Sequence, residues 1–340
     1  MANVFSYYSF DKVLSYNAVY NFVIGARGLG KTFGAKKKAI NDYLNKGWQF
    51  IYLRRYKDEV KDVRSSFFAD IAHFYPDVQF RVKGKEAQIT WDIDAEDKSK
   101  EWHVIGYFLC LSRSQSYKSV SFHMVHTIIY DEFIIEKGVV HYLANESKVF
   151  NDFYSTVDRY QDRTRVLFLA NSMSIMNPYF LEYGIIPGEA GELVRSHGGF
   201  IVAHFPDAAE FVNEVYRTRF GQFIQGTEYS KQAVANVFKD NHDHLLETKT
   251  GRARYKYTLE TIEGVFTVWH DVRTNLYYIT SKRPGGERLF TTVPEKMREG
   301  WQLMNYNDKL LQFLRTAFRK GMVYFDNPVS RNAFVELFRR

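Results

Sequence analysis

The sequence predicts an α/β domain with a parallel sheet, followed by a small helical linker and an α+β domain. The N-terminal part contains strands that are apolar along their whole length, and these strands alternate with helical segments. Strands of this kind are buried on both faces, which requires helices on both sides of the sheet. After about residue 241 the pattern changes to consecutive strands joined by short turns. We therefore expect domains over residues 1–206, 207–240 and 241–340.

The elements of the first domain follow from the spacing of its apolar residues. Apolar residues at helical spacing predict helices, and short uninterrupted apolar runs predict strands. Residues 79–91 are expected to form a hairpin around Gly84, and Pro76 ends the helical pattern that precedes it. The expected helices are residues 31–45, 57–74 and 146–160, and the expected strands are residues 21–24, 49–53, 102–111, 127–130, 166–170 and 199–205.

The last domain has a different organisation. Its first three strands, at residues 255–262, 264–272 and 275–282, are separated by short turns, which predicts an antiparallel meander. A helix near 307–320, a strand at 321–325 and a final helix follow. This succession of strands and then helices is typical of an α+β domain.

The positive charge of the chain is unevenly placed. The formal net charge is +7, and residues 241–340 account for six of these charges, with 17 Lys and Arg against 11 Asp and Glu. A basic surface attracts polyanions because binding releases their counterions. The pattern favours a nucleic-acid partner, and the alternative is a solvated basic surface with no partner.

Other residue patterns exclude several classes of protein. No apolar run reaches the roughly 18–20 uncharged residues of a membrane span, so no membrane partner is expected. The single cysteine, Cys110, lies in an apolar run and is expected to be a buried packing residue in a reducing compartment. His242 and His244 have no companion ligands at metal-binding spacing, so no zinc site is expected.

The most specific motif lies between the first strand and the first helix. It fits GxxxxGK[ST] and consists of Gly25, Ala26, Arg27, Gly28, Leu29, Gly30, Lys31 and Thr32. Glycines let the backbone curl so that its N–H groups face phosphate, and the helix directs the positive end of its dipole there. In this P-loop the lysine reaches the β and γ phosphates, and the threonine hydroxyl coordinates Mg²⁺. The motif therefore predicts a site for ATP and Mg²⁺.

A second motif, TIIYDEF at residues 127–133, is an apolar strand that ends in two acids. Downstream of a P-loop, with other strands between, this pattern indicates a Walker B motif. Asp131 would hold the Mg²⁺ shell, and Glu132 would act as the general base that polarises the attacking water. An adjacent carboxylate of this kind suits a hydrolase.

Two further sets of residues are candidates for the same chemistry. Asn171 ends the strand at 166–170, where a polar residue senses the γ-phosphate in P-loop enzymes with an extra strand between the Walker motifs; the alternative is a plain strand-end turn. Arg159, Arg163 and Arg165 follow the helix before that strand. One of them is a candidate for acting on a neighbouring subunit's nucleotide, and the alternative is a solvated basic turn.

Taken together, these motifs resemble the DNA-packaging ATPases of φ29-type tailed phages. The similar blocks span nearly the whole chain in order, and NFVIGARG and RTRFGxxxxGTEY are far more specific than a bare P-loop. The blocks are residues 21–31, 49–57, 127–133, 177–180, 217–229 and 325–338.

The resemblance implies an architecture and a set of partners. It implies an ATPase domain of the RecA-like additional-strand type, a small linker, and an RNase H-like domain that contacts nucleic acid as a nuclease relic. It implies a pentameric ring that acts on double-stranded DNA in the host cytoplasm, docked transiently on the portal of the prohead and absent from the mature virion. Whether a structural RNA joins the ring to the portal is left open.

The resemblance also assigns roles to individual residues. Arg159 matches the trans-acting arginine finger of the family, and Arg163 remains the rival. Lys118 matches a second basic residue that reaches the neighbouring site. Arg54, Arg55 and Lys57 fall in the family's basic segment after the second strand.

The leading hypothesis is an ATP-driven translocase that packages the phage genome into the prohead. A helicase or an AAA+ remodeller would keep the same P-loop chemistry. A nucleotide-gated nucleic-acid-binding or portal scaffold would bind ATP without turnover, and Glu132 argues against it. A nuclease is not expected, because Asp271 and Asp326 near strand ends have no clear third acidic partner.

Overall fold

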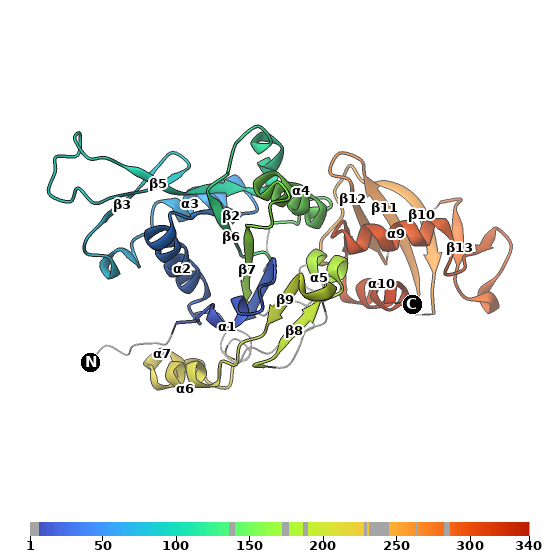
Figure 1. Ribbon diagram of the computed structural model, residues 1–340. Coiled ribbons are helices and arrows are strands. Elements are labelled where there is room, and N and C mark those ends of the chain that lie inside the picture. Colours follow the sequence, from blue (N-terminus) through green and yellow to red (C-terminus); the bar gives the residue numbers. More distant parts are fainter. Residues whose placement is uncertain are drawn as a thin grey trace. The chain divides into compact units, whose positions relative to one another are not determined.

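The computed structural model describes residues 7–135, 140–171, 177–185, 190–227, 230, 245–262, 264–281 and 286–339 (Figure 1). The chain divides into two compact units. The N-terminal unit comprises Met1–Ile134, Lys148–Ile175 and Gly184–Lys239, and the C-terminal unit comprises Ile135–Ser147, Met176–Tyr183 and Asp240–Arg340. The three-domain division expected from the sequence stays a prediction.

The N-terminal unit is built on a nine-stranded sheet in the described part of the chain. Its order is β3-β4-β5-β2-β6-β7-β1-β9-β8. The strands from β5 to β9 in this order are parallel, while β3, β4 and β8 add antiparallel pairs at the edges. The strands are β1 (Tyr20–Gly25), β2 (Gln49–Arg54), β3 (Gln79–Lys83), β4 (Glu86–Thr90), β5 (His103–Cys110), β6 (Val125–Asp131), β7 (Arg165–Asn171), β8 (Leu193–Ser196) and β9 (Ile201–His204).

The α/β class is confirmed, but the sheet is mixed rather than wholly parallel. The expected hairpin forms β3 and β4 and pairs with β5 at one edge. β3 is only half-buried. Parallel strands are normally covered on both faces, whereas an antiparallel strand at the edge of a sheet can remain partly exposed to water. β8 was not expected, because its four residues are partly exposed and carry no continuous apolar pattern.

Helices cover both faces of the parallel core (Figure 1). α2 (Lys31–Lys46) contributes buried residues such as Phe33 and Ile40 to one face. α4 (Glu146–Asp158) covers the other, where the ring of Phe150 stacks on Tyr130 and packs against Phe168. Two short helices lie near the N-terminus of this unit and after β2, namely α1 (Asp11–Leu14) and α3 (Lys57–Arg64). Cys110 is buried, as expected.

The helix expected over residues 57–74 is too long. α3 ends at Arg64, and turns and a short 3₁₀ helix (Ala72–Phe74) follow. The hydroxyl of Ser65 donates to the carbonyl oxygen of Asp62 at 3.0 Å, a local bond that competes with continuation of the helix. The irregular segment still buries Phe67, Phe68 and Ile71, whose spacing resembles that of a helix.

The residues after β9 form two helices in the N-terminal unit, α6 (Ala209–Arg217) and α7 (Arg219–Ile224). They begin the expected linker, and the rest of that segment lies largely outside the described residues. His242 and His244 also lie outside them. No helix in the described ranges is both long and apolar enough to cross a membrane.

The C-terminal unit has a second, six-stranded sheet among the described residues, in the order β14-β13-β10-β11-β12-β15. β10, β11 and β12 form the expected antiparallel meander, while the other strands join by parallel pairing. The elements are α5 (Pro178–Tyr183), β10 (Arg254–Glu260), β11 (Val265–Asp271), β12 (Leu276–Thr280), β13 (Leu289–Thr291), β14 (Trp301–Leu303), α9 (Lys309–Arg319), β15 (Val323–Phe325) and α10 (Pro328–Arg339).

Two segments that precede residue 240, Ile135–Ser147 and Met176–Tyr183, fold with this unit. His141, from the first segment, forms an ion pair with Glu247. In the second segment, Pro178 packs so closely on Gly321 that a Cβ at this glycine would lie 2.7 Å from Cγ of the proline. The C-terminal unit is therefore assembled from three stretches of chain rather than from the last hundred residues alone.

Candidate functional site

The loop between β1 and α2 is held in a tightly curled conformation. Gly28 and Gly30 have φ values of 89° and 77°, which residues with side chains rarely adopt. The surroundings also exclude a side chain, because a Cβ at Gly30 would lie 2.4 Å from the ring of Tyr7. α2 begins directly after Gly30, so the N–H groups of its first turn point toward the loop. This geometry suits a bound anion.

The ammonium group of Lys31 lies inside this loop. It donates to the carbonyl oxygens of Gly25 at 2.9 Å and Ala26 at 2.8 Å, and to Oδ1 of Asn171 at 3.3 Å. β1 and β7 are neighbours in the sheet, which explains how Asn171 reaches the loop that follows β1. Burial lowers the pKa of Lys31 to about 8, while the charge of Asp131 acts in the opposite direction.

Thr32 and Asp131 meet at the end of β6. The hydroxyl of Thr32 donates to both carboxylate oxygens of Asp131, at 3.2 Å and 3.1 Å. The hydroxyl of Tyr52 donates to Oδ2 of the same carboxylate at 2.6 Å. Burial and the charge of Asp131 raise the pKa of Tyr52, so this phenol stays protonated and remains a donor. Asp131 is thus oriented from two sides.

Glu132 directly follows β6 and has a φ of 54°, a left-handed value uncommon for a residue with a side chain. Its Oε2 lies 3.0 Å from Nη2 of Arg54, and its side chain is 59% exposed. Arg54 is buried, and its Nε and Nη1 atoms have no hydrogen-bond partner among the residues described. Next to it, Arg55 fixes the backbone beyond the acid by donating to the carbonyl oxygen of Phe133 at 2.7 Å.

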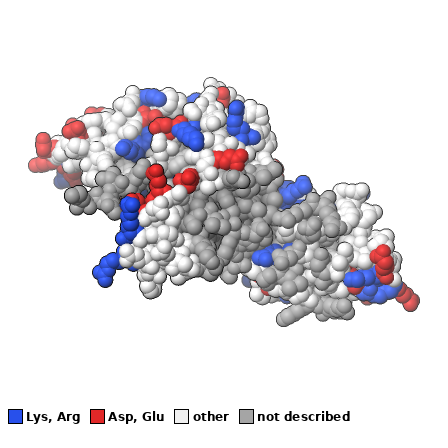
Figure 2. Space-filling view, turned by 90° about the horizontal axis from the view of Figure 1, so that it is seen from below, with Lys and Arg blue, Asp and Glu red and all other residues white. Residues whose placement is uncertain are grey.

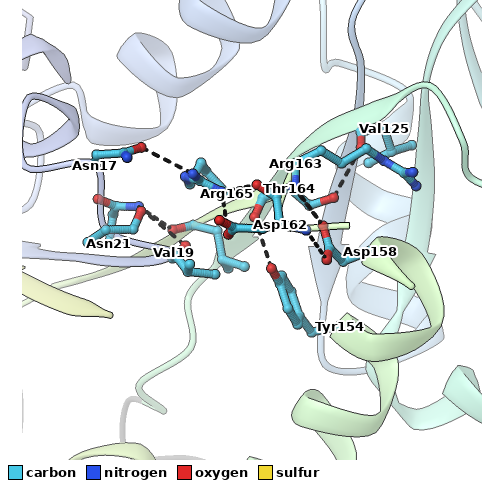
Figure 3. Close-up of polar contacts among 12 residues, drawn as sticks. Asn17, Val19, Asn21, Val125, Tyr154, Asp158, Asp162, Arg163, Thr164 and Arg165 are labelled. Atoms are coloured by element: carbon cyan, nitrogen blue, oxygen red, sulfur yellow. Dashed lines mark hydrogen bonds and ion pairs between the residues drawn. The ribbon is translucent and has the colours of Figure 1, made fainter. Parts of the chain in front are cut away.

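Two of the three arginines after α4 are engaged in the turn itself (Figure 3). Nη2 of Arg163 donates to the carbonyl oxygens of Phe122 at 3.2 Å and Val157 at 2.9 Å. Nη1 of Arg165 pairs with the carboxylate of Asp162 at 3.2 Å. Both guanidinium groups therefore serve to hold the segment between α4 and β7.

Arg159, in contrast, is exposed, and its Nη2 lies 3.5 Å from the carbonyl oxygen of Val120. Val120 is two residues from Lys118, which is also exposed, so the two cations lie on one surface. This surface adjoins the N-terminal end of β7. Asp131 and Asn171, in contrast, lie at the C-terminal ends of β6 and β7, which is the opposite end of these parallel strands. A seven-residue strand spans roughly 20 Å, which places Arg159 beyond reach of its own P-loop.

The turn that carries Arg159 is fixed by the buried carboxylate of Asp158 (Figure 3). Its oxygens accept from the backbone N–H groups of Asp162 at 2.9 Å, Arg163 at 3.1 Å and Thr164 at 2.8 Å. Burial alone would raise the pKa of Asp158, but these hydrogen bonds outweigh it and hold the pKa below its ordinary value. They also support a turn in which three residues have left-handed φ values between 51° and 58°.

Comparison with known proteins assigns this chain to a family. A family model described as podovirus DNA encapsidation protein (Gp16) matches residues 3–340. The chain is 35% identical to the DNA packaging protein of Bacillus phage phi29 over 337 residues, which is 98% of this chain and 97% of that protein. The chain belongs to the podovirus DNA encapsidation family.

Solved structures of this encapsidation family agree with the assignment. A chain of the bacteriophage phi29 viral genome packaging motor assembly is 34% identical, with a TM-score of 0.56 and coverage of 98% of both chains. The N-terminal domain of the DNA packaging ATPase of phi29 is 36% identical, with a TM-score of 0.52. This match covers 60% of the present chain and 98% of the phi29 domain.

The structure brings most of the site residues expected in this encapsidation protein into one cluster. The P-loop residues, Asp131, Glu132 and Asn171 all lie at the C-terminal edge of the parallel strands. The hydroxyl of Thr32 and the carboxylate beside it are hard oxygen donors, which suit Mg²⁺. Lys118 and Arg159 lie elsewhere on the same unit.

Sequence reasoning missed two members of this cluster. The sequence pattern placed Tyr52 only in an apolar strand, and it placed Arg54 only in the basic segment after that strand. Both lie on β2, which pairs with β6 in parallel register, with Tyr52 opposite Ile129. The signal that could have found them is a polar atom near the C-terminal end of the strand next to a Walker B strand.

The different roles of the two arginines predict different effects on stability. We expect Arg163→Ala to lower the free energy of unfolding by about 1–2 kcal/mol, because several carbonyl oxygens lose their donor. We expect Arg159→Ala to change it by less than about 0.5 kcal/mol, as for an exposed side chain. Denaturant unfolding of both variants measures this, and equal losses would contradict the assignment of Arg163 as structural.

Proposed function

We propose that this chain is an ATP-driven motor that moves double-stranded DNA through the portal into the phage prohead. One observation carries the proposal: a lysine, a hydroxyl and two consecutive carboxylates meet at one edge of the sheet, in a chain of the DNA encapsidation family. The family supplies the connection to DNA packaging, and the cluster supplies a chemistry that can drive it.

Hydrolysis of ATP is the reaction that these residues support. The P-loop amides and Lys31 would hold the β and γ phosphates, and Asn171 would contact the γ-phosphate. Glu132 is exposed and would accept a proton from the attacking water. The oxygen of that water would bond to the γ-phosphorus as the bond between this phosphorus and the β,γ-bridging oxygen breaks. The products are ADP and inorganic phosphate.

Thr32 and Asp131 would hold Mg²⁺ with the nucleotide. When bound, this ion neutralises negative charge that develops on the β and γ phosphates. Tyr52 contributes by fixing the carboxylate of Asp131 through a 2.6 Å hydrogen bond, so less ordering of that side chain is needed at binding.

Coupling between subunits would use Arg159. It lies at the opposite edge of the sheet from its own P-loop, so any nucleotide it reaches belongs to another copy of the chain. Arg163 is a poorer candidate, because its guanidinium is bound to backbone carbonyls within the turn. Lys118 would act from the same surface as Arg159.

The finer fold assignments are part of this proposal. β7 separates the P-loop strand β1 from β6, which supports the RecA-like additional-strand type. For the C-terminal unit we propose an RNase H-like nuclease relic, supported by its mixed sheet with covering helices. Asp271 caps a turn at the end of β11, while Asp326 lies beside the end of the antiparallel strand β12. These acids thus stand at opposite ends of the sheet, too far apart to share a metal.

The proposed partners are the portal of the prohead and double-stranded DNA, with subunits arranged as a ring, which we take to be a pentamer. The proposal also allows for a structural RNA between the ring and the portal. The place of action is the host cytoplasm, on the prohead and not in the mature virion. Figure 2 shows one face on which the described basic and acidic side chains are interspersed rather than gathered in one extended basic patch.

An assay with purified proheads, DNA and protein tests the function directly. We expect ATP-dependent entry of DNA into the prohead, measured as DNA protected from nuclease, together with release of phosphate. Protection without hydrolysis would favour a nucleotide-gated scaffold instead. Hydrolysis with strand separation and no protection would favour a helicase.

The role of Arg159 in trans makes a prediction for mixed rings. Rings of Arg159→Ala alone and rings of Glu132→Gln alone should both lose most of their ATPase activity, because each lacks one required residue at every site. Mixing the two variants should restore part of the activity, because a Glu132→Gln subunit supplies Arg159 to the intact site of an Arg159→Ala neighbour. Lys148→Ala, which removes an exposed lysine of the helix preceding Arg159, serves as the control and should be active alone. No recovery of activity in the mixture would show that Arg159 does not act on a neighbour.

A further inference from the structure

Helix α7 presents two aromatic side chains to water. Phe223 is 81% exposed and Phe220 is 59% exposed. They are three residues apart in one helix, so they lie on the same face. Both belong to RTRFGxxxxGTEY, a segment that the proposed hydrolysis of ATP does not use. Neighbouring aromatic rings on a surface are typical of a site that contacts another protein.

Close packing fixes α7, so the fold sets the position of these rings. The hydroxyl of Thr218 caps the helix by accepting from the backbone N–H of Gly221 at 3.0 Å. A Cβ at Gly221 would collide with the carbonyl oxygen of Val215, so α7 packs directly against the backbone of α6. Ile224 is buried, whereas Phe223 beside it is not. The helix thus has one side held by the protein and another that carries the exposed rings.

A groove of about 490 Å³ lies along β4 and β5 of the same unit. Its lining includes Tyr107, Tyr117 and Phe122, and the rings of Tyr107 and Phe122 pack edge to face with centroids 5.6 Å apart. Lys83 and Lys85, both exposed, also line it from the hairpin. Pockets with apolar and aromatic walls are the places where an aromatic side chain of a partner contributes most to binding.

The groove and α7 flank the two halves of the site that neighbouring subunits would share. Val120 lines the groove, and its carbonyl oxygen lies 3.5 Å from Nη2 of Arg159. The groove therefore adjoins the arginine expected to act on another subunit. In α6, Phe211 packs on the P-loop, since a Cβ at Gly28 would lie 2.9 Å from its Cζ. Because α7 packs on α6, it stands on the P-loop side of the shared site.

A ring of identical subunits joins two different surfaces of the chain at each contact. If Arg159 of one subunit reaches the P-loop of the next, the groove beside Arg159 comes to the side of the P-loop where α6 and α7 stand. The charges agree with this pairing. Lys83 and Lys85 are exposed at the groove, while Asp207 and Glu210 are exposed at the start of α6. Opposite charges at the rim of a contact favour the correct partner.

We propose that the exposed face of α7 in one subunit docks, through Phe223, into the groove around Val120 of a second copy of the chain. The inference rests on the proposed function, because it takes from it the ring and the reach of Arg159. The contact would hold the arginine of one subunit at a fixed place beside the P-loop of the next. It gives the α6–α7 corner a role in assembling the shared site.

Cross-linking between separately altered full-length chains tests the contact. Phe223→Cys and Val120→Cys are mixed on proheads with Mg·ATP and a mild oxidant, so a disulfide between the two positions can form only between subunits. Cys110 is buried and should not react. We expect a covalent dimer in the mixture and none with either variant alone. Phe313→Cys, which replaces an exposed ring of α9, should give no dimer with Val120→Cys.

The same mixture separates this inference from the proposed function. Absence of the dimer in a mixture that hydrolyses ATP on proheads would overturn the docking contact and leave the proposed function standing. Wild-type protein that shows no prohead-dependent hydrolysis would instead refute the proposed function.

Truncation of the ring gives a second, independent measurement. We expect Phe223→Ala to raise the protein concentration needed for half-maximal prohead-dependent ATPase activity by about 10-fold, because a buried aromatic contact is lost. The maximal rate should stay within about twofold of wild type, and Phe223→Leu should restore most of the assembly. Phe313→Ala is the matched control and should change neither quantity. An unchanged half-maximal concentration for Phe223→Ala, with or without a lower maximal rate, would contradict a role in docking.

Discussion

Glu132→Gln is expected to lower the turnover number for ATP hydrolysis by about 10²–10⁴-fold while leaving the affinity for Mg·ATP within about twofold of wild type. The carboxamide cannot accept the proton of the attacking water, so general-base catalysis is lost. Binding is retained, because Lys31 and Thr32 hold the phosphates and their ion without Glu132. Phosphate release in single-turnover experiments, together with equilibrium binding of Mg·ATP, measures both quantities.

The substitution also tests how the acid is positioned. The carboxamide of the Glu132→Gln variant would keep an oxygen that accepts from Nη2 of Arg54, so the buried guanidinium retains one partner and the protein should stay folded. Glu101→Gln is the matched control, since this exposed glutamate precedes β5 at the opposite edge of the sheet. Wild-type turnover by Glu132→Gln would assign the general base to another residue.

The P-loop and the Walker B strand could be predicted because their chemistry is local in sequence. A glycine-rich loop between a strand and a helix needs no knowledge of distant residues to indicate a phosphate site. The acids after β6 were also readable, because an apolar strand that ends in Asp-Glu is informative once a P-loop is known. The alternation of buried strands with helices similarly predicted the α/β class.

The residues that sequence reasoning missed depend on which strands become neighbours. Tyr52 contacts Asp131 across 79 positions of sequence, and this contact exists only because β2 lies beside β6. Strand order in a sheet follows from packing of the whole unit and is not encoded in either strand alone. For the same reason, the choice between Arg159 and Arg163 could not be made from spacing: both are arginines in one short turn, and only their partners differ.

The composition of the two units was likewise beyond local pattern. Residues 135–147 begin three positions after Glu132, and residues 176–183 begin five positions after Asn171, yet both belong to the C-terminal unit. Their apolar residues give no indication of which core they join. The chain thus leaves the N-terminal unit within five positions of each of two residues expected to face the γ-phosphate, a relation that appears only when the contacts of the folded chain are known.

Lys31→Ala is expected to weaken Mg·ATP binding by about 100-fold, since it removes a charge-assisted contact to the phosphates. The pH dependence gives a sharper test. Burial lowers the pKa of Lys31 to about 8, and only the protonated ammonium attracts phosphate. Above about pH 8 binding must therefore take up a proton, and wild-type affinity should fall by up to tenfold per pH unit.

The alanine variant should lose this slope together with the affinity. Lys37→Ala, which removes an exposed lysine of the same helix, should keep both the slope and the affinity of wild type. Calorimetric titrations between about pH 7 and 9.5 in buffers of different ionisation enthalpy report affinity and proton uptake in one experiment. If Lys31→Ala retained the alkaline decline, the titrating group would be another residue, and the contact between this ammonium and the phosphates would lose its support.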